Sequence, residues 1–143
     1  MKKILLLTAL LILNLMAQVN QAKQGATYLC VAEKASGFAF VESEWLPQAF
    51  NTDSKYILKR TSIKPDGERL YSLTNFGRNF PSIEDCKQHP KGNTVRCSNA
   101  LGSFTFSIES KRFIKSYLIG YLTGDAESGD DTPHLEIGVC TKI

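Results

Sequence analysis

The stretch GSFTFSIESKRFIKSYLIGY, residues 102–121, has the densest pattern of aromatic and aliphatic side chains in the chain. In its first half, Phe104, Phe106 and Ile108 alternate with polar residues, and this period of two puts apolar groups on one face of a strand. The polar residues 109–112 then interrupt the pattern and predict a hairpin connection. We therefore expect a strand whose aromatic face is turned to the core.

The second half of the stretch, residues 113–121, fits either a strand or a short helix. Phe113, Tyr117 and Tyr121 are four residues apart, the spacing of one face of an amphipathic helix of about two turns. Gly120 would weaken such a helix by about 1 kcal/mol relative to Ala, and the aromatic and β-branched residues around it favour a strand. We predict a strand and keep the helix as the alternative.

The N-terminus has the pattern of an export signal. Lys2 and Lys3 precede an apolar run, residues 4–16, which is shorter than the roughly 20 residues of a membrane-spanning helix. We expect cleavage after Ala22 or Ala17, with residues 1–22 as a signal peptide and residues 23–143 as one domain. The expected location is the periplasm or the exterior of a bacterial cell, without a stable membrane anchor.

The predicted mature chain is nearly neutral. Removal of residues 1–22 would leave 121 residues with 15 basic and 14 acidic side chains. This balance lacks the strongly basic footprint of nucleic-acid-binding proteins, so nucleic acid is set aside as a partner. The length suits a single domain with its own buried core.

The cysteines predict disulfides. An even number of cysteines behind an export signal is typical of an oxidising compartment, and four cysteines allow three pairings. We predict Cys86–Cys97, which would close a local loop, and Cys30–Cys140, which would join the first strand to the last. Such a pair of bonds would close the domain on itself.

The rest of the chain reads mainly as short strands, which we expect at residues 26–33, 38–42, 55–61, 69–76, 94–99 and 134–141. Turns are expected at residues 34–37 and 64–67. Residues 45–50 contain Pro47 and predict a loop or short helix, and an N-cap serine predicts a short helix over residues 82–88. The fold class is therefore mostly β, a small antiparallel barrel or sandwich of about seven or eight strands with one short helix.

Three residues are candidate binding residues, namely Trp45, Phe50 and His134. Trp45, Leu46 and Phe50 most readily predict a plug of the core, and the alternative is an exposed apolar patch for a partner. A concave apolar pocket lined by Trp45 and His134 would favour a binding function. No cofactor is expected.

Two groups of residues have the donor atoms of a metal site. The loop at residues 124–131 gathers the calcium candidates Asp125, Glu127, Asp130 and Asp131, although it lacks the EF-hand pattern and is expected to be a solvated acidic tip. Cys86, His89 and Cys97, with His134, could bind zinc, but a disulfide would consume both thiolates. We therefore predict no metal site.

Catalysis has few candidate residues. The sequence has two histidines and lacks a G-x-S-x-G elbow. Glu42 and Glu44, beside Trp45, could be the paired carboxylates of a glycosidase, but an exposed strand face explains the pair. The main enzymatic hypothesis is a small hydrolase in which carboxylates of residues 125–131 orient and stabilise the His134 imidazole.

A family resemblance accompanies these patterns. Tyr28 and Cys30 near the predicted mature start, with Gly138, Val139 and Cys140 at the end, resemble the pattern of many small exported bacterial proteins. In outline the chain is also similar to the disulfide-tied β-barrel inhibitors of lysozyme that bacteria export. The resemblance implies a barrel, although the inhibitory loop motif of that family is absent from this sequence.

We therefore expect a non-enzymatic binding module, either an inhibitor or immunity-like protein or a ligand binder, that acts through loops on a rigid scaffold. A protein of the periplasm or of the exterior is the expected kind of partner. The alternatives are the small hydrolase and a structural component of the cell envelope whose strand edges pair with neighbours.

Overall fold

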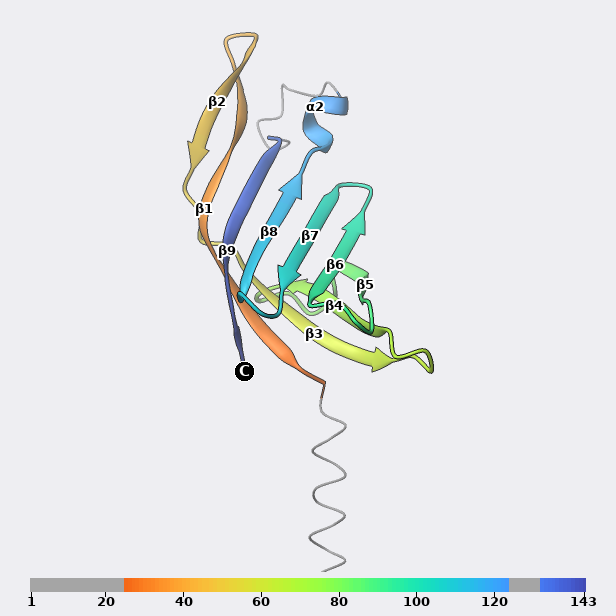
Figure 1. Ribbon diagram of the computed structural model, residues 1–143. Helices are drawn as coiled ribbons and strands as arrows, with labels where there is room; N and C mark the ends of the chain where they lie inside the picture. The colour runs from red at the N-terminus through yellow and green to blue at the C-terminus, as the bar shows by residue number, and fades with distance from the viewer. Residues whose placement is uncertain (1–24, 124–131) are drawn as a thin grey trace, which may run out of the picture.

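A computed structural model describes residues 25–123 and 132–143, which form a mostly β domain (Figure 1). The expected signal peptide and the calcium candidates at residues 125–131 lie outside the described residues. The elements are β1 Thr27–Val41, β2 Glu44–Phe50, β3 Lys55–Ile63, β4 Arg69–Asn75, β5 Ile83–Gln88, β6 Thr94–Asn99, β7 Gly102–Ser107, β8 Arg112–Tyr117, α2 Ile119–Thr123 and β9 His134–Lys142.

Eight strands close into an antiparallel barrel. Each strand from β3 to β8 pairs with the next along the chain, and β1 pairs with both β3 and β9, which closes the sheet on itself. The additional strand β2 pairs with the second half of β1, and together they form a hairpin that extends beyond the barrel (Figure 1). The predicted fold class is confirmed, with a barrel rather than a sandwich.

Both predicted disulfides are confirmed. Cys30 of β1 is directly opposite Cys140 of β9, and the two are bonded. The second disulfide joins Cys86 of β5 to Cys97 of β6. All four cysteines are buried in the core, so the bonds join the first strand to the last and clamp one hairpin from the inside.

The aromatic face of β7 lies in the core, as expected. Phe104 and Phe106 are fully buried, and Phe104 stacks on Phe113 of β8 with ring centroids 5.0 Å apart. Tyr56 and Tyr71 are buried in the same aromatic interior. The hairpin connection between the two strands is also confirmed.

The predicted turn at residues 34–37 is wrong, because β1 continues through it to Val41. Gly37 is needed here for a close approach of strands: a Cβ at this position would lie 2.1 Å from the carbonyl oxygen of Pro133. A shift of register between Ala32 and Lys34 bends the strand, so that its second half leaves the barrel and pairs with β2. The turn lies at Glu42 and Ser43, both with positive φ.

The loop or helix predicted at residues 45–50 is also wrong, since these residues form β2. The proline is tolerated because of its place at a sheet edge. The N–H of Phe38 in β1 points away from β2 and donates a hydrogen bond to the carbonyl oxygen of Pro133. Phe38 and Pro47 are therefore a non-hydrogen-bonded pair, and the nitrogen of Pro47 lies on the free edge of β2. No hydrogen bond of the β1–β2 ladder is lost there.

The helix predicted at residues 82–88 is a strand, β5. Its Lys87 and Gln88 pair with Arg96 and Val95 of β6, next to the Cys86–Cys97 disulfide. The cross-link holds the two segments side by side, and this tertiary constraint overrides the local helix-start signal.

The ambiguous segment after Phe113 divides between the two alternatives. The predicted strand is confirmed as far as Tyr117, but Ile119–Thr123 form the short helix α2. Its Tyr121 and Leu122 are largely exposed. The strand prediction is therefore wrong for these last residues.

Candidate functional site

A buried carboxylate lies at the end of the barrel where β8 ends and β3 and β9 begin. Glu136 is 5% exposed. The phenol of Tyr56 donates a hydrogen bond to one of its oxygens, and the hydroxyl of Ser54 donates to the other over 2.9 Å. Two hydroxyl donors compensate for the loss of water around the carboxylate.

Two basic groups lie next to the same carboxylate. The Lys115 ammonium and the His134 Nε2 are each 3.8 Å from a Glu136 oxygen. The His134 Nδ1 is 2.7 Å from the carbonyl oxygen of Thr132, which fixes the orientation of the ring. We call Ser54, Tyr56, Lys115, His134 and Glu136 the mouth network.

The phenol of the mouth network is perturbed by its surroundings. Burial raises the pKa of Tyr56 above its ordinary value of 10.0, and the hydrogen bond to Glu136 acts in the same direction. Because its proton is held by the carboxylate, Tyr56 acts at neutral pH as a hydrogen-bond donor. Its role in the network is therefore to stabilise Glu136.

The geometry of the mouth network does not assemble a nucleophile with its base. Ser54 donates its hydroxyl to Glu136, so its proton is not directed to His134. The ring of His134 instead contacts two aromatic rings, with centroids 5.7 Å from Tyr117 and 6.2 Å from Phe50. The arrangement favours a structural or ligand-contacting role for the imidazole.

A second feature at the hairpin end of the molecule is an apolar hollow of about 510 Å³, lined by Phe38, Trp45, Leu118, Tyr121, Leu122 and Pro133. We call these six residues the apolar hollow. They come from β1, β2, the α2 region and the residue before β9. Its most exposed members are Tyr121 and Leu122, at 61% and 76%. Side chains of this size are normally buried, so their exposure together indicates an interaction site.

Trp45 lies at the centre of an aromatic row in this region. Its ring centroid is 5.3 Å from that of Phe40, directly opposite on β1, and 5.5 Å from that of Tyr121 on α2. The contact with Tyr121 is edge to face, a favourable geometry for aromatic pairs. The row therefore connects the hairpin to the helix across the hollow.

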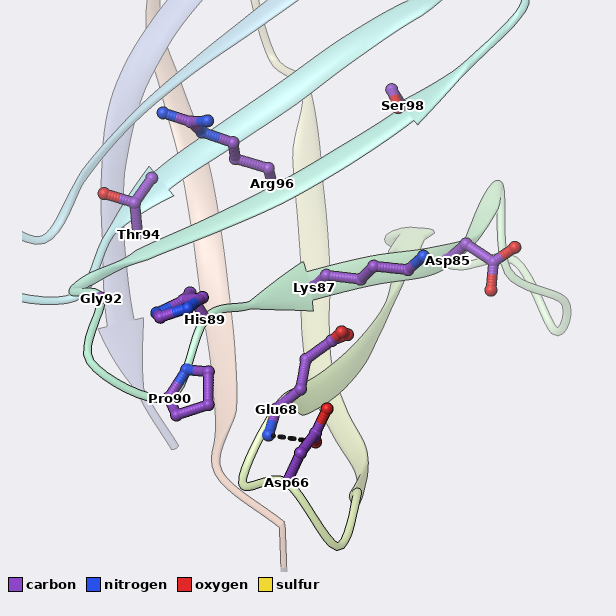
Figure 2. Close-up of a pocket in the computed structure, with 10 residues that line it drawn as sticks. All are labelled: Asp66, Glu68, Asp85, Lys87, His89, Pro90, Gly92, Thr94, Arg96 and Ser98. Atoms are coloured by element: carbon purple, nitrogen blue, oxygen red, sulfur yellow. Dashed lines mark hydrogen bonds between the residues drawn. The ribbon is translucent and has the colours of Figure 1, made fainter.

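A second hollow, of about 940 Å³, lies along β5 and β6 and is polar (Figure 2). It combines basic side chains with the carboxylates of Asp66, Glu68 and Asp85. Lys87 and Arg96 are paired across the two strands, but Figure 2 shows their side chains extending in different directions. The charges do not converge on one point, so this hollow has no evident ligand chemistry.

The three predicted binding residues lie at the same end of the molecule but in two different sites. Trp45 lines the apolar hollow, whereas His134 belongs to the mouth network, where Phe50 contacts it. The predicted core plug is wrong: Trp45 and Phe50 are partly exposed and Leu46 is 45% exposed. The apolar hollow is lined by Trp45 and by Pro133, the residue before His134, but not by His134 itself.

The metal hypotheses have different outcomes. The zinc hypothesis fails because Cys86 and Cys97 are joined in a disulfide. Within residues 25–123 and 132–143, no three His, Cys, Asp or Glu side chains are grouped so that they could hold a metal ion.

The same part of the chain has no helix long and apolar enough to cross a membrane.

With these sites described, the chain can be compared with known proteins. No model of a protein family matches it, and neither a curated protein nor a solved structure does.

Sequence reasoning missed several residues of both sites. Glu136 lies in the strand expected at residues 134–141 but was not singled out, yet it is the buried centre of the mouth network. The available signal was the position of Glu136 directly opposite Lys115 of β8. This position can be recognised only once the pairing of β8 with β9 is known. Leu118, Tyr121 and Leu122 were assigned to a strand or left out, although their 3.6-residue spacing was the signal of α2.

Proposed function

We propose that this chain is a non-enzymatic binding module that takes an apolar small molecule into the apolar hollow. The observation that carries the proposal is the exposure of large apolar side chains from separate elements around one concavity. Its volume of about 510 Å³ lies within the range of roughly 300–1,000 Å³ that ligand sites occupy.

The aromatic walls of the hollow favour a planar apolar ligand. Trp45 and Tyr121 offer ring faces and edges, and such pairings stabilise by about 0.5–1.5 kcal/mol beyond the burial of area. The disulfide-closed barrel supports the hollow, because Phe38 belongs to β1, Pro133 directly precedes β9, and these two strands are bonded at Cys30 and Cys140. A rigid scaffold keeps the entropic cost of binding low.

The proposal also places the protein in an oxidising compartment. Two disulfides and no free cysteine in the chain are typical of the periplasm or of secreted proteins. Export by a signal peptide at residues 1–22, in a bacterium, is part of the same proposal. N-terminal sequencing of the exported protein would test the cleavage site.

Trp45 makes the binding proposal directly measurable, since it is the one tryptophan in the sequence. The neutral apolar dye N-phenyl-1-naphthylamine should bind with saturation and quench Trp45 emission by energy transfer. Leu122→Ser should weaken this binding at least fivefold, whereas Ile63→Ser, an exposed residue at the end of β3, should leave it unchanged. Absence of saturable binding, or equal effects of both substitutions, would refute the proposal.

The hydrolase hypothesis keeps one supporting observation. His134 is oriented by the Thr132 carbonyl and faces Glu136, so a carboxylate of β9 could assist it in place of the predicted loop. The test is a screen of esterase, amidase and glycosidase substrates with the natural chain and with His134→Ala. Activity that is lost in the variant would favour the enzyme over the binding module.

The structural hypothesis requires strand edges that pair with neighbours. The free edge of β2 carries Pro47, which has no N–H to donate to an added strand. The edge is therefore a poor template for a polymer. A monomeric mass by size exclusion with light scattering would count against this hypothesis.

A further inference from the structure

The outer surface of the barrel has an apolar region that the proposed function does not use. The outward side chains of β1, β8 and β9 include Leu29, Val31, Ile114, Leu135, Ile137 and Val139, which we call the aliphatic wall. Four of them, Ile114, Leu135, Ile137 and Val139, are 38–49% exposed. Antiparallel barrels of this kind normally turn polar residues outward.

The strand register makes the wall continuous. Val31 is directly opposite Val139 across β1 and β9, and Ile137 is directly opposite Ile114 across β9 and β8. The alternate residues of these strands point inward, as the burial of Phe113 shows. The exposed aliphatic groups are therefore neighbours on one surface, and a contiguous patch indicates an interaction surface.

Basic residues surround the aliphatic wall. Lys34 is directly opposite Ile137, Arg112 is opposite Val139, and Lys55 is opposite Val31. Lys59 follows on the outward face of β3. The one carboxylate in these outward stretches is Glu33 at the bulge of β1, because Glu136 is buried inside the barrel. The surface thus combines apolar groups with an excess of positive charge.

This combination decides between possible occupants. A second copy of the chain, packed across a twofold axis, would bring the same cations of both copies together, which is unfavourable. An anionic lipid surface offers hydrocarbon for the aliphatic groups and negative headgroups for the cations. A lipid surface can also adapt to the convex outer wall of a barrel, whereas a protein partner would need a complementary concave surface. We infer that the aliphatic wall docks the protein on anionic membranes.

The inference is tested by sedimentation with vesicles. The full protein should bind vesicles of equal parts phosphatidylglycerol and phosphatidylcholine, bind pure phosphatidylcholine weakly, and dissociate as salt is raised. Lys34→Gln with Arg112→Gln should lower the partition coefficient about 25-fold, at about fivefold for each cation. The matched control, Lys87→Gln with Arg96→Gln on β5 and β6, should change it less than twofold.

A second variant separates docking from simple charge attraction. Ile137→Gln should also lower the partition coefficient, whereas Ile63→Gln should not, and circular dichroism should show all variants folded. Binding that is absent, insensitive to Ile137→Gln, or equally reduced by the β5–β6 control would overturn the inference. A stable dimer that Ile137→Gln dissociates, without vesicle binding, would assign the wall to a second copy instead. Dye binding in the apolar hollow should be unaffected by the Lys34 and Arg112 substitutions, so the two proposals fail separately.

Discussion

Trp45 and Tyr121 meet edge to face, with ring centroids 5.5 Å apart, although one belongs to the β1–β2 hairpin and the other to α2. The contact connects the part of the sheet that leaves the barrel to the short helix that follows β8. It defines two walls of the apolar hollow, and both residues are among its lining. The fluorescence of Trp45, the one tryptophan of the chain, should therefore report the position of α2.

The first prediction concerns this contact. Tyr121→Ala should shift the emission of Trp45 to longer wavelength and increase its quenching by acrylamide, because one side of the indole becomes open to water. The measurement is steady-state fluorescence, with Phe80→Ala as the control because Phe80 is 64% exposed and lies outside the hollow. Unchanged emission in Tyr121→Ala would mean that α2 does not cover Trp45 in solution.

The second prediction concerns the two disulfides, which differ in the length of chain that they close. Cys30 and Cys140 are 110 residues apart, and Cys86 and Cys97 are 11 apart. In the chain-entropy model, removing the long bond by paired Cys→Ser substitution should lower the free energy of unfolding by about 5 kcal/mol, and removing the short one by about 3 kcal/mol. Urea unfolding measures both, and a larger loss for the short loop would contradict the prediction.

The third prediction concerns the buried carboxylate. Glu136→Gln replaces one acceptor oxygen by an NH₂ group, so either Tyr56 or Ser54 loses its acceptor. The free energy of unfolding should fall by about 1–3 kcal/mol. Glu109→Gln, on the exposed connection between β7 and β8, should change it by less than about 0.5 kcal/mol. Equal stability of the two variants would show that the mouth network does not stabilise the fold.

The fourth prediction concerns alkaline pH. Burial raises the pKa of both Tyr56 and Tyr71 above the ordinary value of 10.0, so the folded protein holds these protons more tightly than the unfolded chain. Their contribution to stability is full below pH 10 and is lost as the pH rises above it, by up to about 1.4 kcal/mol per pH unit for each phenol. Urea unfolding between roughly pH 9 and pH 11 should therefore show decreasing stability. Tyr56→Phe should flatten this decrease, and an unchanged decrease in this variant would contradict the prediction.

Much of the barrel could be predicted from the sequence because its strands carry a local signal. Alternation of apolar and polar residues located β3, β4, β6, β7 and β9. Four cysteines allow only three pairings, and the chosen one, a local loop together with a bond between the first and last strands, is correct. These patterns were sufficient to predict a barrel or sandwich tied at its first and last strands.

The errors occur where a distant part of the chain decides the local structure. Gly37 looked like a turn residue, but it allows the close approach of Pro133, nearly a hundred positions along the sequence. Pro47 argued against a strand, but a sheet edge tolerates it. β5 has a helix-start pattern that the Cys86–Cys97 bond and β6 override.

The candidate sites were harder to predict than the fold. His134 and Trp45 stood out by residue type, but their neighbours Glu136 and Tyr121 depend on which strands pair and on where β8 ends. Neither the strand pairing nor the end of β8 is determined by the local periodicity of the sequence. The sequence therefore selected one residue of each candidate site without showing that the two sites are separate.

The central claim, that the apolar hollow is a binding site, is tested most directly by chemical-shift mapping of the ¹⁵N-labelled protein during titration with N-phenyl-1-naphthylamine. The account predicts saturable shifts at the amides of Phe38, Trp45, Leu118, Tyr121 and Leu122, with none at Lys87 and Arg96 of the polar hollow. Shifts spread evenly over the barrel, or centred on β5 and β6, would contradict it.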